Sequence, residues 1–98
     1  MDVEFANQEL DRLETGPDFN AGFSRAVVRA FRKRMQMIRD AVDERAFYAM
    51  RSLHFEKLKG KRSHQYSMRL NEQWRLVLEL HKRGRSTVVV IVDIEDYH

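Results

Sequence analysis

The side chains best suited to chemistry stand together at the C-terminal end of the sequence. Asp96, Tyr97 and His98 supply a carboxylate, a phenol and an imidazole in succession. An imidazole, with an ordinary pKa of about 6.5, can take or give a proton near neutrality. The carboxylate can orient it, and the phenol can donate a hydrogen bond or stack on a base. The run therefore predicts acid–base chemistry; the alternative is a frayed chain end.

Two arginines are expected near this run because of a predicted hairpin. Alternating apolar and polar residues indicate strands over 66–70 and 74–80, joined by a polar loop centred on residue 72. This register sets Arg69 directly opposite Arg75, where like charges are destabilising. We therefore expect the pair to hold an anion, because guanidinium forks suit a phosphate that gains charge in a transition state. The alternative is that an acid neutralises the pair: Glu72, Glu95 or Asp96.

A basic segment leads into the hairpin. Its cations are Lys57, Lys59, Lys61 and Arg62. Residues 57–75 hold six basic side chains against one acidic, a net charge of +5, whereas residues 1–20 are acidic. This asymmetry indicates a polyanion partner, first of all nucleic acid, although a solvated surface would have the same composition. RNA can be cut without a metal by its own 2′-hydroxyl if a base, an acid and cations surround the phosphate.

The last strand is expected to bring the terminal run to the arginines. A turn centred between Arg83 and Gly84 would place Val92 opposite Arg75. Residues 87–92 are apolar on both faces, which is typical of a strand in the middle of a sheet. The terminal residues would then continue past the same end of the sheet as the arginine pair.

The upstream half is expected to supply one strand and two helices. Residues 3–5 alternate as a short strand, and residues 7–14 contain helix formers. A second helix follows and ends between residues 47 and 51. The order predicts an α+β fold, a single domain over 1–98, in which the N-terminal strand and two helices pack on a mostly antiparallel sheet.

The second helix has the clearest pattern of all. Asp18 or Asn20 is expected to cap its start. One apolar stripe recurs at helical spacing and predicts a core face: Val27, Phe31, Met35, Ile38 and Val42.

Several classes of site are excluded or disfavoured. Cysteine is absent from the 98 residues, so there is no disulfide framework or thiol nucleophile. The spacings of His54, His64 and His81 match no metal-ligand pattern, and we expect no metal and no cofactor. No apolar run approaches about 18 residues, and the start lacks the regions of a secretory signal. We therefore expect a cytoplasmic protein that does not enter a membrane.

Three segments carry a family resemblance. They are Leu58-Lys59-Gly60, the hairpin 66–75 with the sequence YSMRLNEQWR, and the ending Glu95-Asp96-Tyr97-His98. They are similar to the leucine-lysine-glycine turn, the Tyr-Ser-Ile-Arg-Ile-Asn-x-Gln-Trp-Arg hairpin and the terminal Glu-Asp-Tyr-His of HigB toxins, in the RelE/ParE superfamily. The resemblance covers nearly the whole chain. It implies a RelE-like microbial ribonuclease fold and a type II toxin that cuts mRNA in the ribosomal A site without a metal.

The resemblance also implies a partner and site residues. The partner is a cognate helix-turn-helix antitoxin, similar to HigA. The residues at matching positions serve the RNA site: Lys59, Arg69, Arg75, Asp96, Tyr97 and His98. One departure stands out, because Glu56 occupies the place of a functional histidine in some members, with His54 two residues earlier.

Two other functions are compatible with this fold. ParE-like toxins poison DNA gyrase and generally lack the terminal acid-tyrosine-histidine run, which Asp96, Tyr97 and His98 provide here. A non-catalytic module that holds RNA or an antitoxin would need Arg69, Arg75 and the lysines but not His98. We therefore expect a metal-independent, ribosome-dependent endoribonuclease that inhibits translation and growth.

Overall fold

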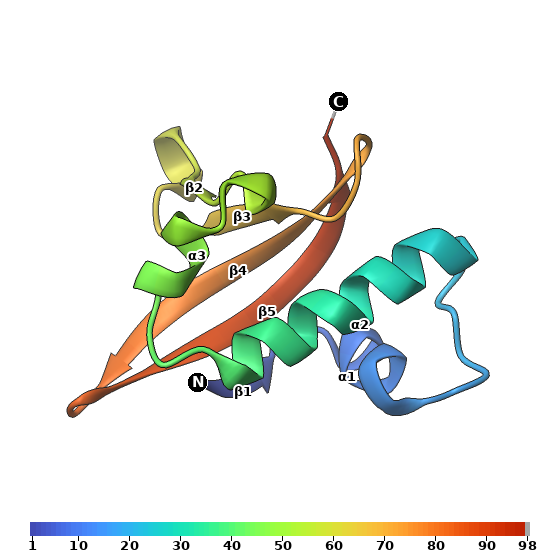
Figure 1. Cartoon of the computed structure of the whole chain (residues 1–98), viewed down its shortest axis with the longest axis horizontal. Coiled ribbons are helices and arrows are strands. Elements are labelled where there is room, and N and C mark those ends of the chain that lie inside the picture. Colours follow the sequence, from blue (N-terminus) through green and yellow to red (C-terminus); the bar gives the residue numbers. More distant parts are fainter. Residues whose placement is uncertain (98) are drawn as a thin grey trace.

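The fold is built on a mixed five-stranded sheet. The computed structural model of the chain describes residues 1–97. The strands are β1 (Asp2–Phe5), β2 (Glu56–Lys57), β3 (Tyr66–Arg69), β4 (Trp74–Arg83) and β5 (Ser86–Asp96). Their order is β1-β5-β4-β3-β2 (Figure 1), and only the β1–β5 pairing is parallel. The predicted middle strand is confirmed, because β5 has a neighbour on each side.

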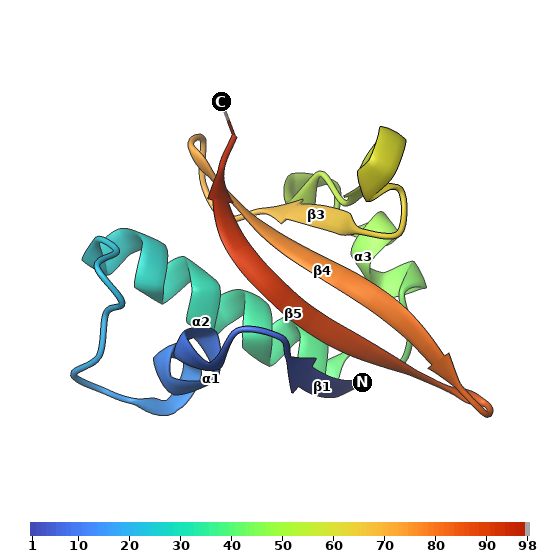
Figure 2. The same cartoon turned by 180° about the vertical axis from the view of Figure 1, so that it is seen from behind.

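The helices leave one face of this sheet open. They are α1 (Gln8–Thr15), α2 (Arg25–Asp40) and α3 (Arg45–Ala49), with short 3-10 turns η1 (Arg51–Leu53) and η2 (Gly60–Arg62). Helices α2 and α3 lie over one face (Figure 1), whereas the view from behind shows β3, β4 and β5 in front (Figure 2). The α+β prediction is confirmed, with one short helix and one short strand more than expected. No helix within residues 1–97 is both long and apolar enough to cross a membrane.

The apolar stripe of α2 forms the core for all but its last member. The first four positions are fully buried: Val27, Phe31, Met35 and Ile38. Val42 is 91% exposed, so its predicted place in the core is wrong. The helix ends at Asp40 because a distant group satisfies its last carbonyls. The amino group of Met1 donates to the carbonyls of Ile38, Arg39 and Ala41 at 3.3, 2.8 and 2.8 Å.

The start of α2 also differs from the prediction. Ser24 is the N-cap, and its hydroxyl accepts a hydrogen bond from the Val27 amide at 3.2 Å. Asn20 instead accepts from the Gly22 amide at 2.8 Å, within the preceding loop. The predicted cap at Asp18 or Asn20 is therefore wrong, because a tight turn uses the asparagine before the helix begins.

The predicted strand register is correct for the first hairpin and wrong for the second. In the first, Arg69 lies opposite Arg75 as predicted. In the second, Glu95 rather than Val92 lies opposite Arg75, so that prediction is wrong. The turn contains only Gly84 and Arg85, with Gly84 at a φ of +62° that suits a two-residue hairpin. A bulge between Val77 and Leu78 then shifts the register again.

Candidate functional site

The arginine pair lies on the open face of the sheet. Side chains alternate between the two faces of a strand. Met68 and Leu76 belong to the core cluster with the helices. Arg69 and Arg75, each one position away, therefore point to the other face. The helices thus pack against one face of the sheet, and Arg69 and Arg75 lie on the other face.

Arg75 is held firmly by three neighbours. Its Nη1 donates to Glu56 Oε1 at 2.6 Å and to Ser67 Oγ at 2.7 Å. Its guanidinium lies over the ring of Tyr97, with Cζ 4.1 Å from the ring centroid. The Arg75 side chain is only 13% exposed, whereas that of Glu56 is 56% exposed. A carboxylate, a cation and a phenol ring are therefore fixed against one another.

Arg69 has hydrogen-bond partners of its own. Its Nε donates to the Asn71 carbonyl at 3.2 Å, and its Nη1 lies 3.5 Å from His54 Nε2. The two arginines are opposed in the backbone register, yet their side chains have different partners. Arg75 forms an ion pair with Glu56, which was not among the acids predicted to neutralise the pair.

Two hollows meet at this cluster. The larger, of about 550 Å³, is lined by Glu56, Lys57, Leu58, Lys59, Arg62, Ser67, Arg75, Val77, Glu95, Asp96 and Tyr97. The smaller, of about 200 Å³, is lined by His54, Arg69, Asn71, Glu72, Arg75 and Tyr97. Arg75 and Tyr97 belong to both, so their stack forms the wall between them.

The predicted basic residues divide into three groups. Lys57 and Lys59 line the larger hollow, and Lys61 is exposed outside it. Arg62 also lines the hollow, but both its terminal nitrogens donate to Glu95, at 2.9 and 2.7 Å. This hydrogen bonding raises the pKa of Arg62 and balances its charge. The lysines are thus the cations that the hollow leaves for a ligand.

The end of the chain reaches the same place. The Tyr97 amide donates to the Gln73 carbonyl at 2.6 Å, and Asp96 accepts from the Gln73 side chain at 3.0 Å. Asp96 is the last residue of β5. Hydrogen bonds to Gln73 therefore hold both residues beside the loop of the first hairpin. His98, the predicted acid–base group, lies outside the described residues.

Two residues of this cluster, Glu56 and Ser67, were not predicted as site residues. Glu56 stood out only as a departure from a family pattern, and Ser67 did not stand out at all. Ser67 is 1% exposed, which is rare for a polar residue without a partner, and it accepts from Arg75. Within residues 1–97 no three metal-ligating side chains cluster.

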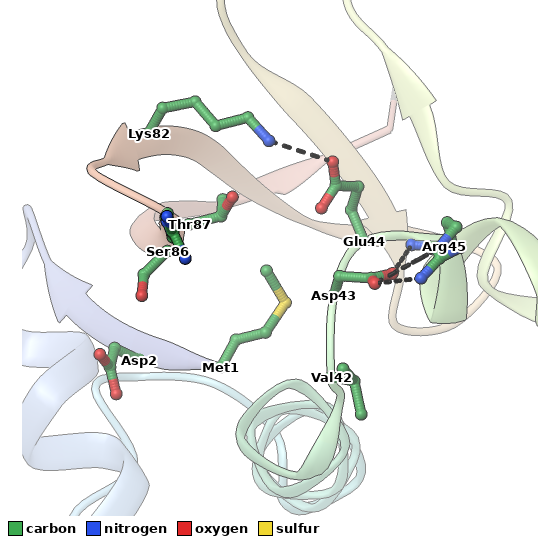
Figure 3. A pocket seen from close by; sticks show the side chains of 10 residues that line it. Met1, Asp2, Val42, Asp43, Glu44, Arg45, Lys82, Ser86 and Thr87 are labelled. Atoms are coloured by element: carbon green, nitrogen blue, oxygen red, sulfur yellow. Dashed lines mark hydrogen bonds and ion pairs between the residues drawn. The ribbon is translucent and has the colours of Figure 1, made fainter.

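A further hollow, of about 540 Å³, lies at the other end of the long β4–β5 hairpin (Figure 3). Its charged groups are largely paired with each other. Arg45 pairs with Asp43 at 2.7 Å, and Lys82 lies 3.6 Å from Glu44. Hydrogen bonds from Arg45 lower the pKa of Asp43 to about 2. This hollow therefore offers less unpaired positive charge to an RNA than the cluster around Arg75.

The sheet, with its helices on one face, defines a fold class that several solved structures share. A YoeB/ParE toxin from Agrobacterium tumefaciens has the same fold, with a TM-score of 0.61, 18% identity and 100% of each chain covered. YafQ from E. coli strain BL21(DE3) has a TM-score of 0.61 at 9% identity, over 98% of this chain and 92% of that one. HP0894 from Helicobacter pylori, a conserved hypothetical protein, has a TM-score of 0.55 at 14% identity, over 99% and 94%.

The sequence then identifies the family within this class. The family of HigB-like toxins, described as the RelE-like toxin of the type II toxin-antitoxin system HigB, matches residues 3–98. The chain belongs to this family. A search of the curated proteins found no match. As a toxin of a type II system, the protein has an antitoxin as its partner.

Proposed function

We propose that the protein is a ribosome-dependent endoribonuclease that cuts mRNA in the ribosomal A site and so inhibits translation and growth. The observation that carries this proposal is the cluster of Glu56, Arg75 and Tyr97 beside two lysines, in a hollow on the open face of the sheet. Residues 1–98 would act as one toxin domain in the cytoplasm. A helix-turn-helix antitoxin similar to HigA would neutralise it.

The reaction needs no more than the groups at this face. The 2′-hydroxyl of the RNA attacks the adjacent phosphate, and the 5′ oxygen of the next nucleotide leaves. Arg75 and Lys59 stabilise the charge that builds up on the phosphate, while Lys57 and Lys61 hold the flanking backbone. Arg69, in the smaller hollow, holds the phosphate on the other side of Tyr97. Tyr97 also stacks on a base.

Proton transfer is assigned to two residues. Glu56 takes the proton of the 2′-hydroxyl, because its Oε1 is held by Arg75 while the side chain is half exposed to the hollow. His98 gives a proton to the leaving 5′ oxygen, and Asp96 orients it. The route needs no metal ion, since the nucleophile belongs to the RNA itself.

The first test is removal of the terminal pair Tyr97-His98. Expression of the intact chain should arrest growth and produce truncated mRNA, whereas the shortened chain should do neither although it remains folded by circular dichroism. Unchanged toxicity of the shortened chain would refute the proposal. Growth arrest with intact mRNA and a DNA-damage response would point to gyrase inhibition instead. Salt-sensitive RNA binding without cleavage would point to a binding module.

A further inference from the structure

The loop of the first hairpin contacts the end of β5. Residues 70–73 form this loop, and the C-terminal end of β5 lies beside it in both views of the molecule (Figure 1, Figure 2). The paired register of β4 and β5 ends at Trp74 and Asp96. The hydrogen bond from the Tyr97 amide to the Gln73 carbonyl, at 2.6 Å, extends the ladder by one residue. Gln73 therefore makes the backbone contact that places Tyr97.

The side chain of Gln73 adds a second contact to the same run. Its Nε2 donates to Asp96 Oδ2 at 3.0 Å. Because donors prefer to lie near the plane of the oxygen that accepts them, this contact restrains the rotation of the Asp96 carboxylate. Gln73 thus holds two successive residues, Tyr97 through its backbone carbonyl and Asp96 through its side-chain amide.

Asn71 gives the loop a defined conformation. Its Oδ1 accepts hydrogen bonds from the Gln73 amide at 2.9 Å and from the Trp74 amide at 2.8 Å. The Leu70 and Asn71 amides both donate to the Trp74 carbonyl, at 2.9 and 3.3 Å. Hydrogen bonds of this kind between an asparagine side chain and the backbone that follows it stabilise a tight turn. The turn therefore fixes the position of Gln73 beside β5.

The stability of the fold gives little reason for the contact between Gln73 and Asp96. Both residues are exposed, so water can replace either partner and the hydrogen bond adds little to the free energy of unfolding. Position at a reaction site is a stricter demand. A displacement of about 1 Å can cost on the order of 100-fold in rate. The contact therefore matters most for where the terminal run lies.

We propose that Gln73 is a positioning residue for the cutting reaction, because it holds Asp96 and Tyr97 at the two hollows beside Arg75. This rests on the proposed ribonuclease function, in which Asp96 orients His98 and Tyr97 stacks on a base. Gln73 lines neither hollow, whereas Tyr97 lines both and Asp96 lines the larger one. Gln73 thus acts through these two residues and not on the RNA itself.

The test removes the side-chain contact and keeps the length of the side chain. Gln73→Met leaves no donor for Asp96. Gln36→Met is the matched control, because Gln36 Nε2 donates to both carboxylate oxygens of Asp40 at 3.1 Å on α2. The mobility of the Asp96 and Tyr97 amides is measured by ¹⁵N relaxation on the free protein. Single-turnover cleavage on programmed ribosomes gives the maximal rate and the half-saturating protein concentration, and both are also measured in an Asp96→Ala background.

Gln73→Met should lower the order parameters of the Asp96 and Tyr97 amides clearly below the value of about 0.85 that is typical of a rigid backbone. The maximal rate should fall by on the order of 10- to 100-fold, while the half-saturating concentration stays within about threefold of the wild type. In the Asp96→Ala background the same substitution should cost no more than about threefold, because the partner of the amide is already absent. Gln36→Met should change none of these quantities.

Unchanged order parameters together with a maximal rate within about threefold of the wild type would overturn the inference. Losses that multiply in the Gln73→Met, Asp96→Ala double variant, or equal losses in Gln36→Met, would also overturn it. A wild type that does not cut mRNA would refute the proposed function. In that case the order parameters still decide whether Gln73 holds the end of β5, because they are measured without RNA.

Discussion

Replacement of Glu56 by glutamine should remove proton transfer at this site while it keeps the hydrogen bond from Arg75. The amide oxygen of glutamine can still accept the hydrogen bond that Arg75 Nη1 now donates to Glu56 at 2.6 Å. The amide cannot take a proton. A general base contributes on the order of 10²- to 10⁴-fold to a rate, which corresponds to about 3–5 kcal/mol of activation free energy. We therefore expect Glu56→Gln to slow mRNA cleavage by about that factor.

The same substitution should leave the fold nearly unchanged. The Glu56 side chain is 56% exposed, and ion pairs at such positions contribute about 0–1 kcal/mol. A loss of activity therefore would not arise from unfolding. Urea denaturation of the variant is the control, and single-turnover cleavage on programmed ribosomes is the assay. A cleavage rate within about threefold of the wild type would refute the assignment of Glu56 as the base.

Replacement of Glu56 by histidine adds a second readout. Imidazoles titrate about 2 pH units above carboxylates, so an imidazole base should act only at higher pH. We expect Glu56→His to keep part of the activity and to move the acidic limb of the pH–rate profile upward by on the order of 2 units. An unmoved profile in an active Glu56→His variant would show that another group takes the proton.

Three further predictions test the fold and the site. In urea titrations, Ile38→Ala should lower the free energy of unfolding by about 2–5 kcal/mol, and Val42→Ala by no more than about 0.5 kcal/mol. Similar losses of stability in the two variants would contradict the end of α2 at Asp40. A hydrogen bond with His81 is the main reason that the pKa of Glu79 is lowered, so the ionised form stabilises the fold above the usual glutamate pKa. The stability gap between wild type and Glu79→Gln should therefore close as the pH falls through the lowered pKa, and a constant gap in pH-dependent melting would contradict this. Arg75→Lys should cut mRNA at least about 10-fold more slowly, because a compact ammonium cannot stack on the Tyr97 ring as the planar guanidinium does while it donates to Glu56 and Ser67. An unchanged rate would show that charge alone suffices.

The first hairpin could be predicted from the sequence because local patterns fix it. The polar loop and the alternation on both sides allow only one register that buries Met68 and Leu76 together, and that register opposes Arg69 to Arg75. The second hairpin has no such constraint. Its turn consists of basic residues and glycine, and its last strand is apolar on both faces. The local sequence pattern therefore predicts neither the centre of the turn nor the bulge near Val77.

Contacts between residues far apart in the sequence explain the other differences between the predicted and the observed structure. The spacing of the α2 stripe continues to Val42, but the amino group of Met1 closes the helix before it. The partner of Arg75 could not be predicted either. Glu56 reaches it from β2, two strands away from β4 and joined to the sheet by only two residues. The pairing of Arg62 with Glu95 likewise joins residues 33 positions apart.

We propose that this protein cuts mRNA on the ribosome and that the residues of the open face and the terminal Asp96, Tyr97 and His98 are needed for it. The most direct test maps the 5′ ends of mRNA in a cell-free translation reaction. It compares the intact chain, a chain without Tyr97-His98 and a reaction without ribosomes. New 5′ ends should appear only where the intact chain and ribosomes are both present. Intact mRNA in every reaction, with the protein shown to be folded, would contradict it.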